Sequence, residues 1–406
     1  MNDMIIAQAG QIVAAVYKQA TGQAVPAALN LADYISIATT ALKTGKDVLM
    51  NAMSQMWGET VFAVRPYTGS FTDMEFSTTR WGNADRKVSY ASRMPEANGA
   101  YAYPVAYDGT ESVPTGDGES VDMYKINKDK IVQTVFYGRS TYAYHRTRFL
   151  DQLETAFKSP DELVRYNAAA VQALANDREG WAESMRRGLI INAMGAIAEE
   201  AQTGRVVHLL TEYNTATGQS LTATTVRLPA NYAPFMRWVY ARLGDLKDRF
   251  RENNTLYTTQ LSALTTDGWY ILRHTPADRL KIKMLSSELH QMRASVLSTT
   301  YNADYLNLDG VEGVAYWQAP STPDSFSVKP CYTKTDGTQK SGGDTVTASG
   351  ILGIMYDEDF VGCTKISDSV YATPFNPNGE YWNDFYKEVY KTRFDMSEKA
   401  VLLVID

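Results

Sequence analysis

The residue types that most often carry chemistry are sparse in this chain, and they do not fall into catalytic or metal-binding spacings. The four histidines are His145, His208, His274 and His290, and none has a partner at the spacing of a zinc motif such as HExxH. His145 stands in a Tyr-His-Arg run, where we expect a structural histidine with satisfied hydrogen bonds rather than a general base. The sequence therefore predicts no metal site, no cofactor site and no catalytic histidine.

Two groups of carboxylates have the composition of acid/base pairs, but each has a local explanation. Asp161-Glu162 follows Ser159 and caps an expected helix, and Asp357-Glu358-Asp359 lies at the end of an expected strand. The glycine pair in Gly342-Gly343-Asp344 precedes no helix, so it is not a phosphate-binding loop, and no GxSxG motif is present. Because an active site can be assembled from distant residues, these absences weaken the enzyme hypothesis without removing it. The prediction is a protein that is not an enzyme.

Composition sets further bounds on function. The chain has 406 residues, 44% of them hydrophobic, and a net charge of -7, so it can bury a large core but lacks the basic surface of a protein that grips nucleic acid. No stretch has the roughly twenty apolar residues of a membrane span, and no secretory leader is recognisable, so we expect a chain that is cytosolic when made. Cys331 and Cys363 fit no metal clip or disulfide framework and are expected to be free thiols. The 26 tyrosines suit extended protein interfaces.

One long helix is the element around which we expect the rest to be arranged. Ser159, Pro160 and the acidic first turn mark its start, and Gly204 marks a left-handed C-cap. Glu183 is placed on its polar face, and internal glycines indicate close approach of another backbone or a bend. The apolar stripe is predicted at Leu163, Tyr166, Ala170, Leu174, Trp181, Met185 and Leu189, and the glycines are Gly180, Gly188 and Gly195.

Before this helix, the sequence predicts a helical N-terminus and an extended hairpin. Short amphipathic helices are expected at residues 4–18, 29–42 and 47–57, packed either on the same domain or on a neighbour. Residues 94–120 are rich in proline and glycine and lie between strand-like runs at 86–92 and 121–137. Loops of this length are uncommon in compact domains and are usually functional or disordered, so we expect a hairpin that extends from the body.

After the long helix, alternating strands and helices predict a compact α/β unit. A helix over residues 234–253 would bury Phe235, Val239, Leu243, Leu246 and Phe250. A third helix is expected to open at Pro276 and run to about Leu297, and residues 333–350 are expected to form a solvated loop. Strands are predicted at 206–210, 222–228, 269–272, 351–356, 380–393 and 400–405, with a loop before the fifth of them.

This order of parts resembles the major capsid proteins of tailed bacteriophages, the Hong Kong ninety-seven type of coat fold. The stretch from Asn376-Pro377-Asn378-Gly379 to Ala400-Val401-Leu402-Leu403 is similar to the C-terminal strand region of head proteins from small short-tailed phages. Gly353-Ile354-Met355-Tyr356 resembles the strand that precedes it, and Arg65-Pro66-Tyr67 with Arg80-Trp81-Gly82 resembles the entry into the extended loop. The likeness extends over essentially the whole chain.

The resemblance implies an α+β tailed-phage coat fold with five parts. These are an N-terminal helical arm (1–60), an extended β-hairpin loop or E-loop with flanking strands (61–130), a peripheral domain with a spine helix at 159–203 (131–230), an α/β axial domain (231–373) and C-terminal strands that return to the peripheral domain (374–406). Some shells of this type form a lysine to asparagine cross-link. Lys87, Lys125 and Lys128 flank the loop, and none is assigned to that role.

The function implied is a structural capsid protein that self-assembles as pentamers and hexamers into an icosahedral-type shell. The shell would enclose double-stranded DNA without sequence-specific binding, would involve portal and scaffolding proteins but no membrane, and would be assembled in the host cytoplasm as part of the virion. Two alternatives remain at this point: an encapsulin-like protein compartment of the same fold, and an unrelated α/β enzyme. Nucleic acid content separates the first from a phage head, and a monomeric particle would favour the second.

Overall fold

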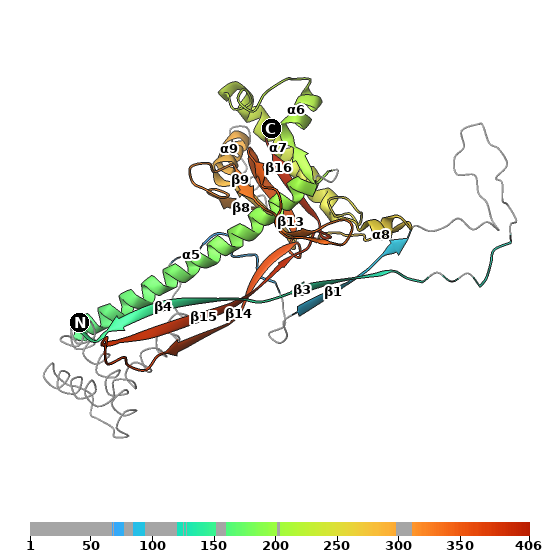
Figure 1. Ribbon diagram of the computed structural model, residues 1–406. Coiled ribbons are helices and arrows are strands. Elements are labelled where there is room, and N and C mark those ends of the chain that lie inside the picture. The colour runs from blue at the N-terminus through green and yellow to red at the C-terminus, as the bar shows by residue number, and fades with distance from the viewer. Residues whose placement is uncertain are drawn as a thin grey trace. The chain divides into compact units, whose positions relative to one another are not determined.

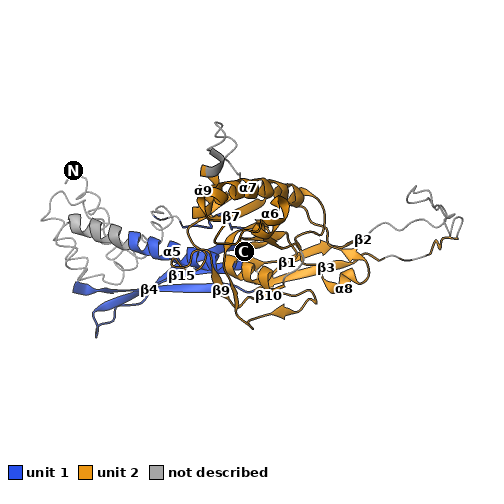
Figure 2. Ribbon diagram, turned by 90° about the horizontal axis from the view of Figure 1, so that it is seen from above, with its two compact units in different colours: residues 1–83, 138–189, 362–392 blue, residues 84–137, 190–361, 393–406 orange. Residues whose placement is uncertain are grey.

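The computed structural model describes most of the chain from residue 67 onward. The backbone is described for residues 67, 69–76, 84–93, 120–124, 126, 128–151, 160–200, 204–297 and 311–406, and side chains for all of these except 160–171 and 295–297. The helices expected at 4–18, 29–42 and 47–57 and the turn-rich residues 94–119 lie outside this part. The chain forms two compact units, shown in blue and orange in Figure 2. Unit 1 comprises 1–83, 138–189 and 362–392, and unit 2 comprises 84–137, 190–361 and 393–406.

The expected long helix is present as α5 (Pro160–Glu200), 41 residues long (Figure 1). It begins with the predicted proline, because a missing N–H and a fixed φ suit the first helical position. Its first part belongs to unit 1, and from Ile190 it belongs to unit 2. Gly204, predicted as the C-cap, lies beyond the helix end but has a φ of 88°, in the left-handed region where glycine is favoured.

The predicted apolar stripe of α5 is wrong at Trp181. Leu174 is buried as predicted, but the buried side chains that follow as far as residue 182 are Ala175, Arg178 and Ala182. Trp181 is 42% exposed and contacts Tyr142 edge-on at 5.1 Å between ring centroids. The buried position between Leu174 and Ala182 is occupied by Arg178, whose charge is neutralised by a carboxylate of the sheet. The periodicity was counted over apolar residues alone, so it missed Arg178 and placed Trp181 on the buried face.

Glu183 does not face solvent as expected. Its carboxylate accepts a hydrogen bond of 2.7 Å from the Tyr67 hydroxyl and pairs with Arg187 at 2.5 Å. The nearby Glu179 carboxylate accepts a hydrogen bond of 3.2 Å from the Gly69 amide. This face of α5 therefore binds Tyr67 and Gly69 of its own unit.

Of the three internal glycines of α5, one marks a close approach. A Cβ atom at Gly195 would lie 2.4 Å from Cγ1 of Val328, whereas Cβ atoms at Gly180 and Gly188 would meet nothing within 4 Å. At Gly195 the close neighbour is a side chain rather than the predicted backbone, and at Gly180 and Gly188 the described residues show no close approach.

Unit 1 is built on a three-stranded sheet with α5 on one face (Figure 1). The strand order is β14 (Val361–Ala372), β15 (Tyr381–Phe394) and β4 (Ser140–Phe149). β15 and β4 are antiparallel, with Tyr381 opposite Phe149 and Tyr390 opposite Ser140. β15 confirms the predicted aromatic strand, but β14 was expected to be loop, because its lysine, aspartate and serines obscure the alternation of a strand.

Charged side chains join α5 to this sheet and join β4 to β15 within it. Arg178 Nε donates a hydrogen bond of 2.8 Å to Glu388, and Arg148 pairs with Asp384. Both carboxylates are buried, and each has an arginine as its partner, which removes the large penalty of an unpaired buried charge.

Unit 2 is built on a five-stranded sheet. Its order is β5 (Val206–His208), β16 (Ala400–Val404), β13 (Ile351–Asp357), β7 (Leu280–Leu285) and β8 (Val311–Val314). β5 is parallel to β16 and β7 is parallel to β8, while β13 is antiparallel to both of its neighbours. Together with the helices this makes the α+β chain that the sequence predicted, and β13 and β16 confirm two of the expected strands.

The helices of unit 2 include α6 (Leu209–Thr217), α7 (Pro229–Arg251), α8 (Ser262–Thr265) and α9 (Ser286–Leu297). α7 begins five residues earlier than predicted because Pro229 takes the first helical position, and Pro234 lies inside the helix. Its predicted apolar stripe is confirmed, since all five side chains are fully buried in the core of the unit.

Two predicted elements of unit 2 are wrong, and a third is shorter than predicted. Residues 280–285 form β7 rather than the start of a helix, with Lys283 buried and paired to Glu312. The strand from Val206 ends at His208, where α6 follows. Residues 222–228 form turns, because Thr222 and Thr225 exchange amide-to-hydroxyl hydrogen bonds of 2.7 and 3.2 Å that compete with strand pairing.

The segment expected to be a solvated loop contains short strands. β9 (Phe326–Val328) pairs with β12 (Val346–Ala348), and β10 (Tyr332–Thr333) pairs with β11 (Gln339–Lys340). The residues from 333 to 350 are nonetheless exposed or half-buried, as predicted. Among the helices that the structure describes, none is long and apolar enough to cross a membrane.

Candidate functional site on the β1–β3 ribbon

The strands of the predicted hairpin form a two-stranded ribbon. β1 (Ala84–Tyr90) is antiparallel to β3 (Ile131–Tyr137), with Ala84 opposite Tyr137 and Tyr90 opposite Ile131 (Figure 1). β3 begins at Ile131, ten residues later than the strand-like run predicted from residue 121. Side chains alternate between two faces, which we call the outer ribbon face (84, 86, 88, 90, 131, 133, 135, 137) and the inner ribbon face (85, 87, 89, 132, 134, 136).

The outer ribbon face is mostly apolar, with Arg86 and Gln133 as its polar members, and the described residues leave it exposed. Exposure ranges from 45% for Val88 to 81% for Tyr137, and Tyr90, Ile131 and Val135 fall between them. Tyr90 lies opposite Ile131 and Tyr137 opposite Ala84, whereas Val88 lies opposite Gln133 and Val135 opposite Arg86. Several exposed apolar side chains gathered on one face, with polar ones between them, are typical of an interaction site.

The inner ribbon face is charged and bound to its own unit. Lys87 pairs with Asp395 at 2.5 Å and with Glu398. Arg273 donates a hydrogen bond of 2.7 Å to the Ser89 hydroxyl and pairs with Glu398 at 3.2 Å. Burial alone would raise the pKa of Asp395, but the charge and hydrogen bond of Lys87 hold this pKa below its ordinary value. We call Lys87, Arg273, Asp395 and Glu398 the ribbon latch.

A second group of charges lies beside the latch. The guanidinium of Arg393 lies 5.8 Å from the ring centroid of Phe136 on the inner ribbon face, and it pairs with Asp359, which also pairs with Arg279. Asp359 belongs to the carboxylate group that the sequence placed at a strand end. Burial opposes its ionisation, yet the two arginines hold its pKa below the ordinary value, so it is an ion-pairing group rather than a proton donor.

Beyond the ribbon, β2 (Ser92–Arg93) pairs with β6 (Trp269–Tyr270). Ala91 packs in a small apolar cluster with Leu264 and Ile271. The root of the hairpin is thus held by charges along β1 and by apolar packing at its end. Of the other lysines that flank the loop, Lys128 is exposed and Lys125 is outside the described part.

The histidines and cysteines are scattered, as predicted. His145 contacts Phe385 edge-on at 4.7 Å, His208 pairs with Asp406, and His274 and His290 are exposed. No disulfide forms: Cys331 is exposed, and burial raises the pKa of the Cys363 thiol to about 12. Within the described residues no group of three or more His, Cys, Asp or Glu side chains could hold a metal ion.

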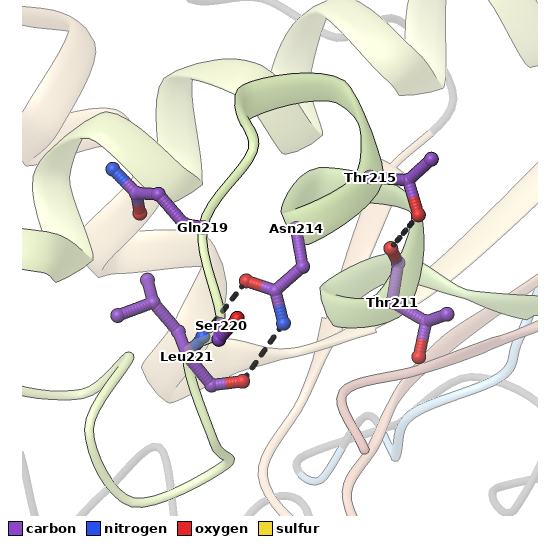
Figure 3. Close-up of a pocket in the computed structure, with 6 residues that line it drawn as sticks. All are labelled: Thr211, Asn214, Thr215, Gln219, Ser220 and Leu221. Carbon is purple, nitrogen blue, oxygen red and sulfur yellow. Dashed lines mark hydrogen bonds between the residues drawn. The ribbon is translucent and has the colours of Figure 1, made fainter.

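One polar depression of about 400 Å³ lies where α6 ends (Figure 3). The side chain of Asn214 donates to the Leu221 carbonyl at 2.8 Å and accepts from the Leu221 amide at 3.0 Å, and the Thr215 hydroxyl donates to the Thr211 carbonyl at 2.8 Å. These groups hold the loop to the helix, and none of the six lining residues is charged. The polar groups of the depression are explained by this structural role, and we do not assign a catalytic or binding site to it.

The ribbon latch could not be found from sequence, because its members lie far apart in the chain. The apolar residues of β3 were visible in the sequence, but they occupy both faces of the strand and do not say which face is covered. Only the fold shows that the charged face is the bound one.

Comparison with known proteins gives one family and a set of similar folds. A sequence profile of the Phi29-like phage major capsid protein family matches residues 15–404. A search of curated proteins found no match. The capsid structure of Staphylococcus phage Andhra is similar with a TM-score of 0.51 and 8% identity, over 84% of this chain and 86% of that chain.

A chain in the structure of the head fiber and inner core protein of native bacteriophage P68 is similar to the same degree. Its TM-score is 0.51 and its identity 10%, over 84% of this chain and 85% of that chain. At such low identities the likeness concerns the fold, and it is the fold of tailed-phage capsid proteins.

Proposed function

The chain belongs to the Phi29-like phage major capsid protein family and is a structural protein of the virion, and on that premise we propose that the ribbon joins its copies into the head shell. The shell is of the Hong Kong ninety-seven type, with pentamers and hexamers in an icosahedral-type arrangement. It encloses the double-stranded DNA genome of a tailed phage without sequence-specific binding. Portal and scaffolding proteins take part in its assembly in the host cytoplasm.

Within this proposal the parts of the chain have separate roles. Residues 1–60 act as an arm and 61–130 as the extended loop. Residues 131–230, with the spine helix at 159–203, form the peripheral domain, 231–373 form the axial domain, and 374–406 return to the peripheral domain. The long helix α5 supports the assignment of a spine helix, and the five-stranded sheet supports the assignment of a separate axial domain.

The observation that carries the proposal is the outer ribbon face. Its apolar side chains stay exposed while the opposite face is fixed by the latch, so the ribbon offers an ordered surface that the described residues of its own unit leave uncovered. A surface that meets a different surface on the next copy gives a heterologous contact, and such contacts close into rings and shells when the rotation between copies allows it.

The test places a charge on the outer ribbon face. Val135→Asp changes a side chain of β3 that is 49% exposed, and Leu256→Asp changes an apolar side chain that is 46% exposed and lies off the ribbon. Both variants are expected to unfold within about 0.5 kcal/mol of the wild type, because surface substitutions have small effects on stability. Only Val135→Asp is expected to lose shells, measured by light scattering and electron microscopy.

Wild-type yields of shells from Val135→Asp would contradict the proposal, as would equal loss from both variants. The nucleic acid content of purified particles separates a phage head from an encapsulin-like compartment, and the family match favours the head. Particles that hold protein cargo and no nuclease-resistant DNA would reverse that preference.

A further inference from the structure

A tight turn in unit 1 leads from β14 into β15. It is closed by a hydrogen bond of 3.0 Å from the Asn376 amide to the Tyr381 carbonyl, and residues 377–380 form the turn between them. All four turn residues are exposed, and two of them are the pair Asn378-Gly379. Solvent therefore reaches both members of this pair.

An asparagine that precedes a glycine can react with the glycine amide. The amide nitrogen gives its proton to hydroxide and attacks the Cγ atom of the asparagine, so a nitrogen–carbon bond forms. The side-chain nitrogen takes up a proton from water and leaves as ammonia. Water then opens the resulting succinimide at one of its two carbonyl groups, which gives either aspartate or isoaspartate. Glycine favours the reaction because it has no side chain to hinder the attack.

The turn leaves both reacting groups of this pair free. Within the described residues, neither the Gly379 amide nor the Asn378 side chain makes a hydrogen bond. The Asn378 amide donates one hydrogen bond, of 3.1 Å, to Oδ1 of Asn376, and this bond does not involve the reacting atoms. The attack therefore requires no hydrogen bond to be broken first.

Two neighbouring asparagines lack these conditions. Asn376 precedes Pro377, whose nitrogen carries no hydrogen and cannot make the attack. Asn383 lies within β15, and its side chain accepts a hydrogen bond of 2.8 Å from the Thr147 hydroxyl. The residue after it, Asp384, is fully buried in the same strand. Both asparagines are internal controls for the turn.

The packing of the turn requires the glycine that makes the asparagine reactive. A Cβ atom at Gly379 would lie 2.3 Å from Cε1 and 2.5 Å from Cδ1 of Tyr381, so a larger residue does not fit unless the ring moves. The Tyr381 ring packs edge-on against Phe149 of the opposite strand, at 6.0 Å between centroids. The reactive pair is thus part of the way this end of the sheet is built.

We propose that Asn378 is a site of spontaneous modification in the folded subunit, where attack by the Gly379 amide converts it to aspartate and isoaspartate. The reaction uses only water and the atoms of this chain, so it does not depend on shell assembly. Because the attacking amide must lose its proton, the rate rises with pH.

The modification changes the charge at one end of the unit 1 sheet. Each converted subunit gains a carboxylate two residues before Glu380, whose carbonyl accepts a hydrogen bond of 2.9 Å from the Leu150 amide. Asp151 follows directly, so the new charge adds to those of two carboxylates. Isoaspartate also adds one methylene group to the backbone of the turn. Old subunits therefore differ from new ones in charge and in the geometry of this turn.

The test follows each asparagine over time in folded, unassembled subunits at pH 7 and pH 9, with the chain unfolded in guanidinium chloride as the reference. Samples are digested in acid, and mass spectrometry with electron-transfer fragmentation measures aspartate and isoaspartate. We expect Asn378 to convert faster than Asn376 and Asn383, and faster at pH 9 than at pH 7. Its rate in the folded subunit should lie within about tenfold of the unfolded rate, a restraint of at most about 1.4 kcal/mol.

Two variants give the matched comparison. Asn378→Gln is expected to lose the products, because its longer side chain would have to close a six-membered ring, and Asn383→Gln is expected to keep them. A folded-state rate at Asn378 no higher than that at Asn383 would overturn the inference, and so would a rate that unfolding raises by more than about tenfold. Aspartate without isoaspartate would indicate direct hydrolysis of the side chain and overturns it as well.

Discussion

Replacing Lys87 by methionine tests whether the ribbon latch fixes the ribbon. The side chains of Lys87, Asp395 and Glu398 are 20%, 5% and 9% exposed. Removing one partner of a buried ion pair typically costs about 3 to 5 kcal/mol, because the other charge is left uncompensated. Glu398 keeps Arg273 at 3.2 Å and Lys87 is partly exposed, so we expect a loss near the lower end, about 3 kcal/mol at pH 7.

The pH dependence of this loss follows from Asp395. Burial works to raise its pKa, and Lys87 outweighs burial and holds it below the ordinary 3.8. Since this folded-state pKa is depressed, the stabilisation is complete above the ordinary pKa and is lost as pH falls through the lower value. Without Lys87, burial is opposed only by the hydrogen bonds from Ser397, so the pKa of Asp395 rises above its wild-type value and acid more readily neutralises the unpaired charge. The stability gap between wild type and Lys87→Met should therefore narrow from pH 7 to pH 4.

The assay is urea unfolding of unassembled subunits at both pH values. Lys87→Met with Asp395→Asn should be more stable than Lys87→Met alone, because no buried charge is then left unpaired. Lys329→Met, which changes an exposed lysine, is the control and should unfold like the wild type. The reasoning would be refuted by a Lys87→Met loss below about 0.5 kcal/mol, or by a gap that widens in acid.

Two further pairs of variants test the helix. Gly195→Ala should destabilise by about 1 to 3 kcal/mol because its Cβ would lie 2.4 Å from Val328, whereas Gly188→Ala, with open space around it, should stabilise by roughly 1 kcal/mol; thermal unfolding compares the two. Trp382→Ala should lose about 3 to 5 kcal/mol as a fully buried tryptophan, and Trp181→Ala about 1 kcal/mol, the size of its edge contact. Equal denaturation midpoints for the two tryptophan variants would mean that Trp181 is buried as deeply as Trp382, and that the buried face of α5 is not the one described above.

Local signals in the sequence were enough for the elements whose burial is decided by their own periodicity. The stripe of α7 is apolar at helical spacing and is buried throughout, and Ser159-Pro160 marks the start of α5. The strands β13 and β16 are continuous apolar runs, as expected of strands in the middle of a sheet.

Prediction from the sequence failed where the burial of a charged side chain depends on a partner far away in the chain. β7 contains Lys281 and Lys283, which break the apolar run, and the buried Lys283 is paired with the distant Glu312. Arg178 is buried on α5 because Glu388 of another element neutralises it. The latch depends in the same way on Lys87 meeting Asp395, and no local pattern in either stretch indicates the other.

The place of β16 in the five-stranded sheet bears on how the chain folds. β16 lies between β5 and β13, so Val206–His208 has no strand neighbour in its sheet until Ala400–Val404 arrives. Closing so long a loop before its contacts form is entropically expensive and slows folding. Until that closure, the apolar edge of β13 is open to other chains, and aggregation competes with folding. A fragment that ends before Ala400 lacks an interior strand of this sheet, so it cannot complete the fold of unit 2. Truncated chains are therefore excluded from the pool of folded subunits before any contact between copies forms.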